Sequence, residues 1–382
     1  MRVLHVIPKL VIGGAEQFAL NLVHGLNELP GVESLLVYWE PIFQFEDAMK
    51  MHTRKINLEL DLGLGRINKS KLKEWDDLVL EFKPDIIHSH LFQAELVARA
   101  NSRPGIRYFS SVHDNMHQLD SLWQKGMQKI PAAFWEKHLA HTYYRKSQNR
   151  FLAVSKDTQA YLKRVLPADL AKRVDLVYNG VPTSKFKVYQ RDFPTHFTAE
   201  NPLKIINVGS FRSFKGQEKL IVALHSLLSQ GCFLELTFLG QGQEMQACMS
   251  LAESLGISQQ VKFKGILHEL QPEYAQHHLY VHASSSESFG LVLIEALAAG
   301  LPAIALDAGG NREVLSDAVC TRMLPNNSST DDIANAILEW YAHPAQFKEA
   351  SERAEILASS FDFSKTLSSI LAHYQASLNQ SE

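Results

Sequence analysis

Short apolar runs alternate with helical patterns along almost the whole chain of 382 residues. The run RVLHVI is typical of a buried strand, and GAEQFALNLVHGLNE, a few residues later, repeats apolar residues at helical spacing. The runs PDIIHSH, RYFSSVHD and RFLAVS continue the alternation further along. This pattern predicts an α/β fold built on a parallel, doubly wound sheet.

The alternation is interrupted once, between Asn179 and Pro202, by a stretch rich in Pro, Thr and Asn. It resumes with LKIINVGS, LELTFLG, VKFKG, LYVHAS and PAIALDAGG. A chain of this length is too long for one ordinary core. We therefore place a domain boundary here and expect two similar, Rossmann-like domains. Ligands bind at the carboxyl ends of the strands in such sheets, so we expect the two sets of strand-end loops to face each other across one cleft.

Composition excludes several classes of protein. The chain has 38 Lys and Arg against 41 Asp and Glu, and a nucleic-acid-binding protein is usually strongly basic. Its three cysteines show no ligand spacing, and no Asp-x-Asp triplet occurs. We therefore expect no dedicated metal site. The N-terminus has no cleavable signal pattern and no apolar stretch is long enough to span a bilayer, so a cytoplasmic location is expected.

Three predicted strand-end loops could approach a phosphate. Gly14 opens the first helix, and glycine there lets the backbone come close to an anion. Arg212 and Lys215 lie between a predicted strand and a predicted helix, where two cations could bind a diphosphate. The alternative is a solvated basic turn, which the same sequence would also fit. The run GQG at 240–242 starts a dinucleotide fingerprint, but Met245 replaces its third glycine. A nicotinamide-dependent oxidoreductase is therefore disfavoured.

Two glutamates flank the start of a predicted helix. Glu295 interrupts the apolar run LVLIEALA, and Glu287 precedes it by eight residues. Eight helical residues span about 12 Å, whereas the two carboxylates of a retaining glycosidase lie about 5 Å apart. The spacing instead suits the two ends of an elongated ligand, with one carboxylate on a ribose diol and the amides of Phe289, Gly290 and Leu291 on phosphate or sugar oxygens. The alternative is a Glu295 paired with a neighbouring Lys or backbone group.

Three histidines lie at or near predicted strand ends in the first half of the chain. They are His88, His90 and His113. A single histidine in such a place more often packs or forms a hydrogen bond than acts in catalysis. His113, in SSVHDN, is the best catalytic candidate because its loop would face the ligand cleft.

The chain resembles the retaining family 4 glycosyltransferases, which have the GT-B fold. The most specific part is SSSESFGLVLIEALAAGLPAIALDAGGNREVL, which contains the Glu-x7-Glu signature, and GGAE, DIIHSHL, VHD, NGV and KG support it. The resemblance extends over nearly the whole length. It implies an acceptor-side domain over 1–187, a nucleotide-sugar donor domain over 188–361, and a C-terminal helix over 362–382 that returns to the first domain.

The resemblance also implies roles for single residues. Glu295 would bind the ribose, Glu287 the donor sugar near its reacting end, and Lys215 the diphosphate, while His113 would lie close to the anomeric centre. Backbone contacts to sugar and diphosphate are implied for Phe289, Gly290 and Leu291.

Three further donor-site positions follow from the same resemblance. Gly14 would let the first loop approach the phosphates, and the backbone at Ile266 would read the base. The family arginine is replaced here by Ser210, so Arg212, two residues further on, is the candidate to take over its role.

The function implied is retaining, metal-independent transfer of a sugar from a nucleotide sugar, expected to be a UDP-sugar, to a glycan or lipid-linked glycan in surface polysaccharide synthesis. The nucleotide sugar is a co-substrate, and no separate cofactor is expected. Two alternatives stay open: a sugar-nucleotide epimerase of the same fold, and a non-catalytic nucleotide-sugar-binding subunit.

The stretch 121–165 carries nine Lys and Arg against two acids, interleaved with aromatic residues. Such a stretch can lie on an anionic membrane surface. The hypothesis is peripheral association with the inner membrane face. The alternative is an ordinary helix with solvated lysines and buried aromatic residues.

Overall fold

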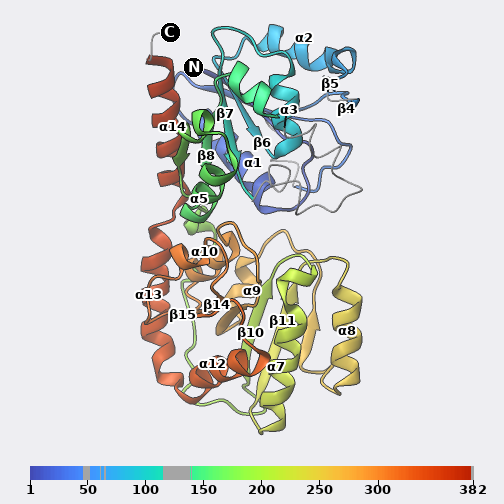
Figure 1. Ribbon diagram of the computed structural model, residues 1–382. Helices are drawn as coiled ribbons and strands as arrows, with labels where there is room; N and C mark the ends of the chain where they lie inside the picture. Colours follow the sequence, from blue (N-terminus) through green and yellow to red (C-terminus); the bar gives the residue numbers. More distant parts are fainter. Residues whose placement is uncertain (46–51, 61, 64–65, 115–137, 139, 380–382) are drawn as a thin grey trace. The chain divides into compact units, whose positions relative to one another are not determined.

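The computed structural model describes residues 1–382 except 46–51, 61, 64–65, 115–137, 139 and 380–382 (Figure 1). The chain divides into two compact units. The first comprises Met1–Asn179 with Lys365–Glu382, and the second comprises Gly180–Ser364.

The first unit is built on a seven-stranded sheet of order β3-β2-β1-β6-β7-β8-β9, and every pairing in it is parallel. Its strands are β1 (Arg2–Val6), β2 (Glu33–Tyr38), β3 (Thr53–Lys55), β6 (Ile86–His90), β7 (Arg107–Val112), β8 (Arg150–Ala153) and β9 (Val174–Leu176). The short strands β4 (Leu62–Gly63) and β5 (Arg66–Ile67) form a separate antiparallel pair. All five residues of β6 are buried, as expected for a strand covered on both faces of a parallel sheet.

The helices of the first unit connect these strands. They are α1 (Gly14–Asn27), α2 (Lys73–Phe82), α3 (Phe92–Ala100), α5 (Lys156–Val165), α6 (Ala168–Ala171) and, at the end of the chain, α14 (Phe363–Asn379). The strand order reverses next to β1, where β2 lies on one side and β6 on the other. Ligand sites in doubly wound sheets lie at such a point.

The second unit has a six-stranded parallel sheet of order β12-β11-β10-β13-β14-β15. Its strands are β10 (Leu203–Val208), β11 (Leu234–Leu239), β12 (Val261–Phe263), β13 (Leu279–His282), β14 (Ala303–Leu306) and β15 (Thr321–Leu324). Its α-helices are α7 (Gln217–Ser229), α8 (Met245–Ser254), α9 (Gln271–Ala275), α10 (Leu291–Ala298), α11 (Asn311–Val314), α12 (Thr330–Ala342) and α13 (Phe347–Ser359). The order reverses between β10 and β13, so the loops after these two strands are expected to hold the ligand site. The prediction of doubly wound α/β architecture is confirmed for each unit.

The chain enters the second unit earlier than the residue 187–188 boundary expected from the sequence, because residues after Gly180 bond to the segment before α14. Val181 N–H donates to Phe361 O at 3.1 Å, and the Thr183 hydroxyl donates to the Asp362 carboxylate at 2.6 Å. The two places where the chain passes between the units are thus held together inside the second unit.

Helix α14 packs in the first unit. The hydroxyl of the buried Tyr374 contacts His88 Nδ1 on β6, and Arg107 Nε on β7 donates to Ser377 O at 3.1 Å. The Thr366 hydroxyl donates to Tyr178 O at 2.9 Å. The last helix is therefore tied to β6 through a buried polar contact and to the rest of the first unit through partly buried ones.

Replacing Tyr374 with Phe is expected to lower the free energy of unfolding by about 1–3 kcal/mol, because the buried His88 Nδ1 loses its partner. Denaturant titration followed by circular dichroism measures the change. Tyr189→Phe is the matched control, since Tyr189 is 85% exposed and its loss of a hydroxyl should change nothing. Equal midpoints for both variants would show that the Tyr374 contact does not stabilise the fold.

Candidate functional site

Two loops of the second unit meet at the point where its strand order reverses. The loop after β10 contains a short 3-10 helix, Ser213–Lys215, and the loop after β13 leads into α10. Ser285 N–H donates to Phe214 O at 2.8 Å and so ties the loops together. Gly216 adopts a positive φ of 67°, and a Cβ there would stand 2.4 Å from Ala283 O. Only glycine allows this approach, which brings Lys215 next to the second loop.

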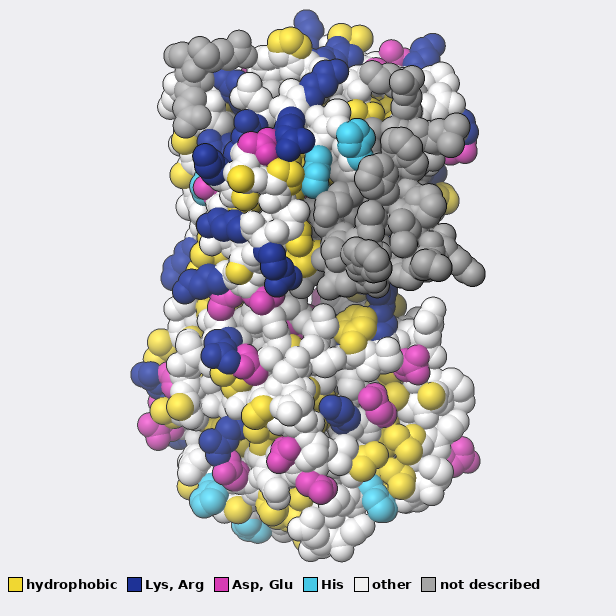
Figure 2. All heavy atoms as spheres, in the orientation of Figure 1, with side chains coloured by type: hydrophobic (Ala, Val, Ile, Leu, Met, Phe, Trp, Pro, Cys, Tyr) yellow, Lys and Arg dark blue, Asp and Glu magenta, His cyan; other side chains and the backbone are white. Residues whose placement is uncertain are grey.

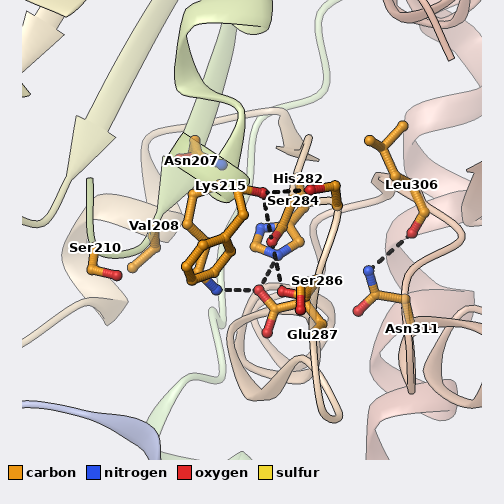
Figure 3. A network of polar contacts seen from close by, with 12 residues as sticks. Asn207, Val208, Ser210, Lys215, His282, Ser284, Ser286, Glu287, Leu306 and Asn311 are labelled. Atoms are coloured by element: carbon orange, nitrogen blue, oxygen red, sulfur yellow. Dashed lines mark hydrogen bonds and ion pairs between the residues drawn. The ribbon is translucent and has the colours of Figure 1, made fainter. Parts of the chain in front are cut away.

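Glu287 is the centre of the site. Its Oε1 accepts hydrogen bonds from Lys215 Nζ and, at 2.7 Å, from His282 Nε2 (Figure 3). The side chains of Lys215 and Glu287 are only 16% and 12% exposed. Burial alone would raise the pKa of Glu287, but the hydrogen bond and charge of His282, together with Lys215, lower it to about 2. Glu287 is therefore ionised at neutral pH and acts as an acceptor of hydrogen bonds.

His282 is a site residue that the sequence analysis missed. It ends β13, is buried, and its Nδ1 lies 3.4 Å from the hydroxyl of Tyr280. That hydroxyl donates to Val208 O on β10 at 3.2 Å. The one signal in the sequence was that the apolar run LYVH ends in a polar residue. The sequence could not show that His282 pairs with Glu287, because the conformation of the loop between them decides which side chains meet.

Glu295 lies on α10 and is partly buried. Neither a Lys nor a backbone group pairs with its carboxylate within the described part of the chain; its Oε2 accepts a hydrogen bond from the hydroxyl of Tyr274 at 3.3 Å. Burial raises the pKa of Glu295 to about 7 even though Tyr274 lowers it. The carboxylate is therefore short of hydrogen-bond donors, and a ligand with hydroxyl groups could supply them.

The start of α10 is open. Gly290 precedes the helix with a φ of 82° and no side chain caps it. A Cβ on Gly290 would stand 2.7 Å from Asn311 Oδ1, a buried atom without a hydrogen-bond partner among the described residues. The first amides of an uncapped helix favour an anion. The predicted backbone contacts of Phe289, Gly290 and Leu291 fall on this helix start. The Phe289 ring itself is buried, and its centroid lies 5.6 Å from that of the Phe361 ring.

Two other predicted donor-site residues lie in the second unit. Ile266 follows β12 and is 38% exposed. The side chain of Arg212 is exposed and, within the described part of the chain, forms no hydrogen bond or ion pair that would join it to Lys215 and Glu287. The structure thus brings the side chains of Lys215 and Glu287 together, whereas Arg212 meets Lys215 only through its backbone, where Lys215 N–H donates to Arg212 O at 2.8 Å.

Gly14 and His113 belong to the first unit. Gly14 is the first residue of α1, behind the extended Gly13. His113 follows β7, and its Nε2 lies 3.2 Å from His90 Nδ1. Burial lowers the pKa of His113 to about 3, so this imidazole is neutral at neutral pH.

Much of the basic, aromatic stretch 121–165 lies outside the described residues, namely 121–137 and 139. In its described part, the Tyr144 ring is buried and its hydroxyl contacts Glu95, while Arg145 pairs with Asp169 at 2.7 Å. Lys and Arg side chains are frequent on the face of the first unit that Figure 2 shows, in the region of α5. Among the described helices, none has both the length and the apolar composition needed to cross a bilayer.

Two family models match the chain, one on each side of residues 186–187. Residues 12–185 match the model described as Glycosyltransferase Family 4, and residues 188–356 match the model described as Glycosyl transferases group 1. The chain is a glycosyltransferase of the GT-B fold. More particularly, it is a family 4-like glycosyltransferase.

One curated protein is similar to this chain in sequence, and two solved structures are similar to it in fold. The D-inositol 3-phosphate glycosyltransferase of Rhodococcus erythropolis is 28% identical over 305 residues, which cover 76% of this chain and 67% of that protein. Anabaena HepE in complex with UDP and glucose is similar in structure, with a TM-score of 0.79, 19% identity and coverage of 98% and 99% of the two chains. Sucrose-phosphate synthase from Thermosynechococcus elongatus gives a TM-score of 0.78 at 19% identity over 100% of both chains.

The raised pKa of Glu295 predicts a pH dependence of stability. Because its pKa rises from 4.5 to about 7 on folding, the folded protein binds this proton more tightly than the unfolded chain does. Stability from this group is complete below pH 4.5 and is lost as the pH rises through 7. Glu295→Gln should remove that loss, because Gln does not ionise. The free energy of unfolding of the variant, relative to that of the wild type, should therefore rise between these pH values in denaturant titrations without ligand. The exposed Glu253 gives the control variant, Glu253→Gln, which should follow the wild type; a parallel course for Glu295→Gln as well would contradict the prediction.

Proposed function

We propose that the protein transfers a sugar, with retention of anomeric configuration, from a UDP-sugar to a glycan or lipid-linked glycan. The observation that carries the proposal is Glu287, held ionised by Lys215 and His282 beside the open start of α10. A protein of similar structure adds support, since HepE forms a complex with UDP and glucose.

The donor is proposed to lie along the start of α10. Lys215 and the first amides of the helix would hold the diphosphate, because a cation and uncapped N–H groups both favour an anion. The ribose diol would donate its two hydroxyl hydrogens to Glu295, which accepts a hydrogen bond from Tyr274 alone among the described residues. Glu287 would accept hydrogen bonds from hydroxyls of the sugar, and the backbone at Ile266 would contact the base.

The chemistry is proposed to be stabilisation of the leaving group. Breaking the bond between sugar and phosphate builds negative charge on the diphosphate, and preorganised donors stabilise that charge most in the transition state. Glu287 is unsuited to donate a proton at neutral pH, since its pKa is about 2. A carboxylate with so low a pKa is also a weak base, and its Oε1 is held by Lys215 and His282. Retention would then proceed by front-face substitution, in which the departing phosphate accepts the proton of the acceptor hydroxyl.

The charge on the diphosphate would be neutralised by Lys215 and helix amides, so the reaction is proposed to need no metal ion or separate cofactor. The acceptor is proposed to be a growing surface polysaccharide or its lipid-linked precursor. The enzyme would then work in the cytoplasm, with peripheral contact between its basic first unit and the inner membrane face. Gly14, His113 and Arg212 are proposed to take the roles that the family resemblance implies, with Arg212 as a further contact to the diphosphate.

The test is turnover of UDP-, GDP- and ADP-sugars with glycan and lipid-linked acceptors, followed by NMR of the product linkage. UDP release that depends on acceptor, with an α-linkage formed from an α-donor, is the expected result. Lys215→Ala should lower kcat by about 10²–10³-fold, because it removes a preorganised charge from the leaving group. The matched control is Lys262→Ala, since Lys262 forms an exposed ion pair with Glu235 at 2.7 Å in the same unit.

Each alternative gives a different outcome. A β-linkage from an α-donor excludes retention, and an epimerised nucleotide sugar without transfer identifies an epimerase. Tight UDP binding without turnover of any donor identifies a binding subunit. If Lys262→Ala lost as much activity as Lys215→Ala, the proposed role of Lys215 at the leaving group would be contradicted.

A further inference from the structure

A single arginine, Arg191, bridges two helices of the second unit. It lies in the irregular segment that follows the 3-10 helix Thr183–Lys185. Its partly buried guanidinium donates to three carbonyl oxygens. Nη2 donates to Tyr274 O at 3.1 Å and to Ala299 O at 2.7 Å, and Nη1 donates to His277 O. Burial lowers the pKa of Arg191 to about 10, so the group remains charged at neutral pH. The proposed function gives it no role.

The three carbonyls lie at the carboxyl ends of α9 and α10. Tyr274 is in the last turn of α9 and His277 follows that helix, while Ala299 is the C-cap of α10. Carbonyls at a helix end are only partly satisfied within the helix and carry partial negative charge. A planar guanidinium has five donors and can reach acceptors on two helices at once. Arg191 therefore fixes the end of α9 against the end of α10.

The same two helices carry Tyr274 and Glu295. Tyr274 is wholly buried, and its hydroxyl donates to Glu295 Oε2 at 3.3 Å. Among the described residues, the hydrogen bonds that join α9 and the turn after it to α10 and its C-cap are this one and the bridge through Arg191. An O–H···O hydrogen bond is usually about 2.7 Å long, so the bond to Glu295 is a long one that a small shift of α9 would break.

The segment that contains Arg191 also holds α9 at two other places. Gln271 Nε2, at the start of α9, donates to Lys187 O at 3.2 Å. The centroid of the Phe186 ring lies 6.1 Å from that of the Tyr274 ring. The segment 186–191 thus contacts the start of α9, its tyrosine ring and its end, and it sets where the Tyr274 hydroxyl lies.

The second oxygen of Glu295 is open to a ligand. Oε1 forms no hydrogen bond with the described residues, and it is not one of their buried side-chain atoms that lack a partner. It therefore reaches the surface of the unit, where a hydroxyl group can donate to it. The bond from Tyr274 to Oε2 fixes the plane of the carboxylate and so decides where Oε1 points.

We propose that Arg191 is a positioning residue for the nucleotide sugar: by bridging α9 and α10 it keeps the Tyr274 hydroxyl on Glu295 Oε2 and aims Oε1 at the ribose diol. The effect on the donor rests on the proposed function, whereas the effect on Glu295 does not. A merely structural anchor would change stability without acting through Tyr274.

Calorimetric titration with UDP, at a pH above the Glu295 pKa of about 7, tests whether Arg191 acts through Tyr274. Arg191→Met and Tyr274→Phe should each weaken UDP binding about tenfold, the effect of one hydrogen bond to a charged group. The double variant should also bind about tenfold more weakly than the wild type, because the second change removes nothing further. The matched control is Arg322→Met, which loses an exposed pair with Glu339 at 3.1 Å in the same unit and should bind UDP like the wild type.

A second readout needs no ligand. The hydrogen bond from Tyr274 lowers the pKa of Glu295, so Arg191→Met and Tyr274→Phe should both raise it, whereas Arg322→Met should not. NMR of carboxyl-labelled glutamate across a pH titration measures the pKa, and the signal is identified by its loss in Glu295→Gln. Arg191→Lys keeps the charge without the planar fork and should raise the pKa as well, so it carries the test if Arg191→Met does not fold.

Two results would overturn the proposal. One is a loss of about a hundredfold in the double variant, because independent effects multiply. The other is an unshifted Glu295 pKa in Arg191→Met and Arg191→Lys. If Glu295→Gln bound UDP as tightly as the wild type while the pKa shift was present, the ribose site of the proposed function alone would be contradicted. Weak UDP binding by Glu295→Gln without a pKa shift in the Arg191 variants would contradict the positioning role alone.

Discussion

The contact of Glu287 with Lys215 and His282 is the interaction on which the proposed donor site depends. It joins the loops that follow β10 and β13, the two strands between which the order of the second sheet reverses. Gly216 makes the contact possible, because any side chain there would collide with Ala283 O. Breaking the contact would leave a buried carboxylate unpaired, which is strongly destabilising. The same contact therefore holds the two loops together and keeps Glu287 ionised.

The two glutamates differ in charge state because their surroundings differ. Glu287 has two cationic or donating partners and a pKa of about 2, whereas Glu295 has one hydroxyl partner and a pKa of about 7. One carboxylate is thus satisfied before a ligand arrives, and the other gains donors when a ligand binds. This difference suits binding of two ends of a ligand and is unlike the acid and nucleophile of a glycosidase.

The sequence was sufficient for the architecture, since the alternation of strands and helices predicted both parallel sheets. It also singled out Glu287, through the Glu-x7-Glu stretch, and Lys215, through its place between a strand and a helix, but it did not predict that the two side chains pair. The partners His282 and Tyr274 were missed, because hydrogen bonds between side chains depend on loop turns and helix placement that no spacing encodes. His88 and His90 were noticed but given no role, since pairing across β1, β6 and β7 is set by sheet register. That register places His5 beside them from more than eighty positions away.

We propose that the start of α10 binds the diphosphate of a nucleotide sugar. Amide hydrogen exchange with and without UDP tests it most directly, because the amides of Phe289, Gly290 and Leu291 would donate to the ligand. Slower exchange in a peptide covering these residues when UDP is added is the predicted result. Unchanged exchange there, together with protection of another segment at saturating UDP, would contradict the account.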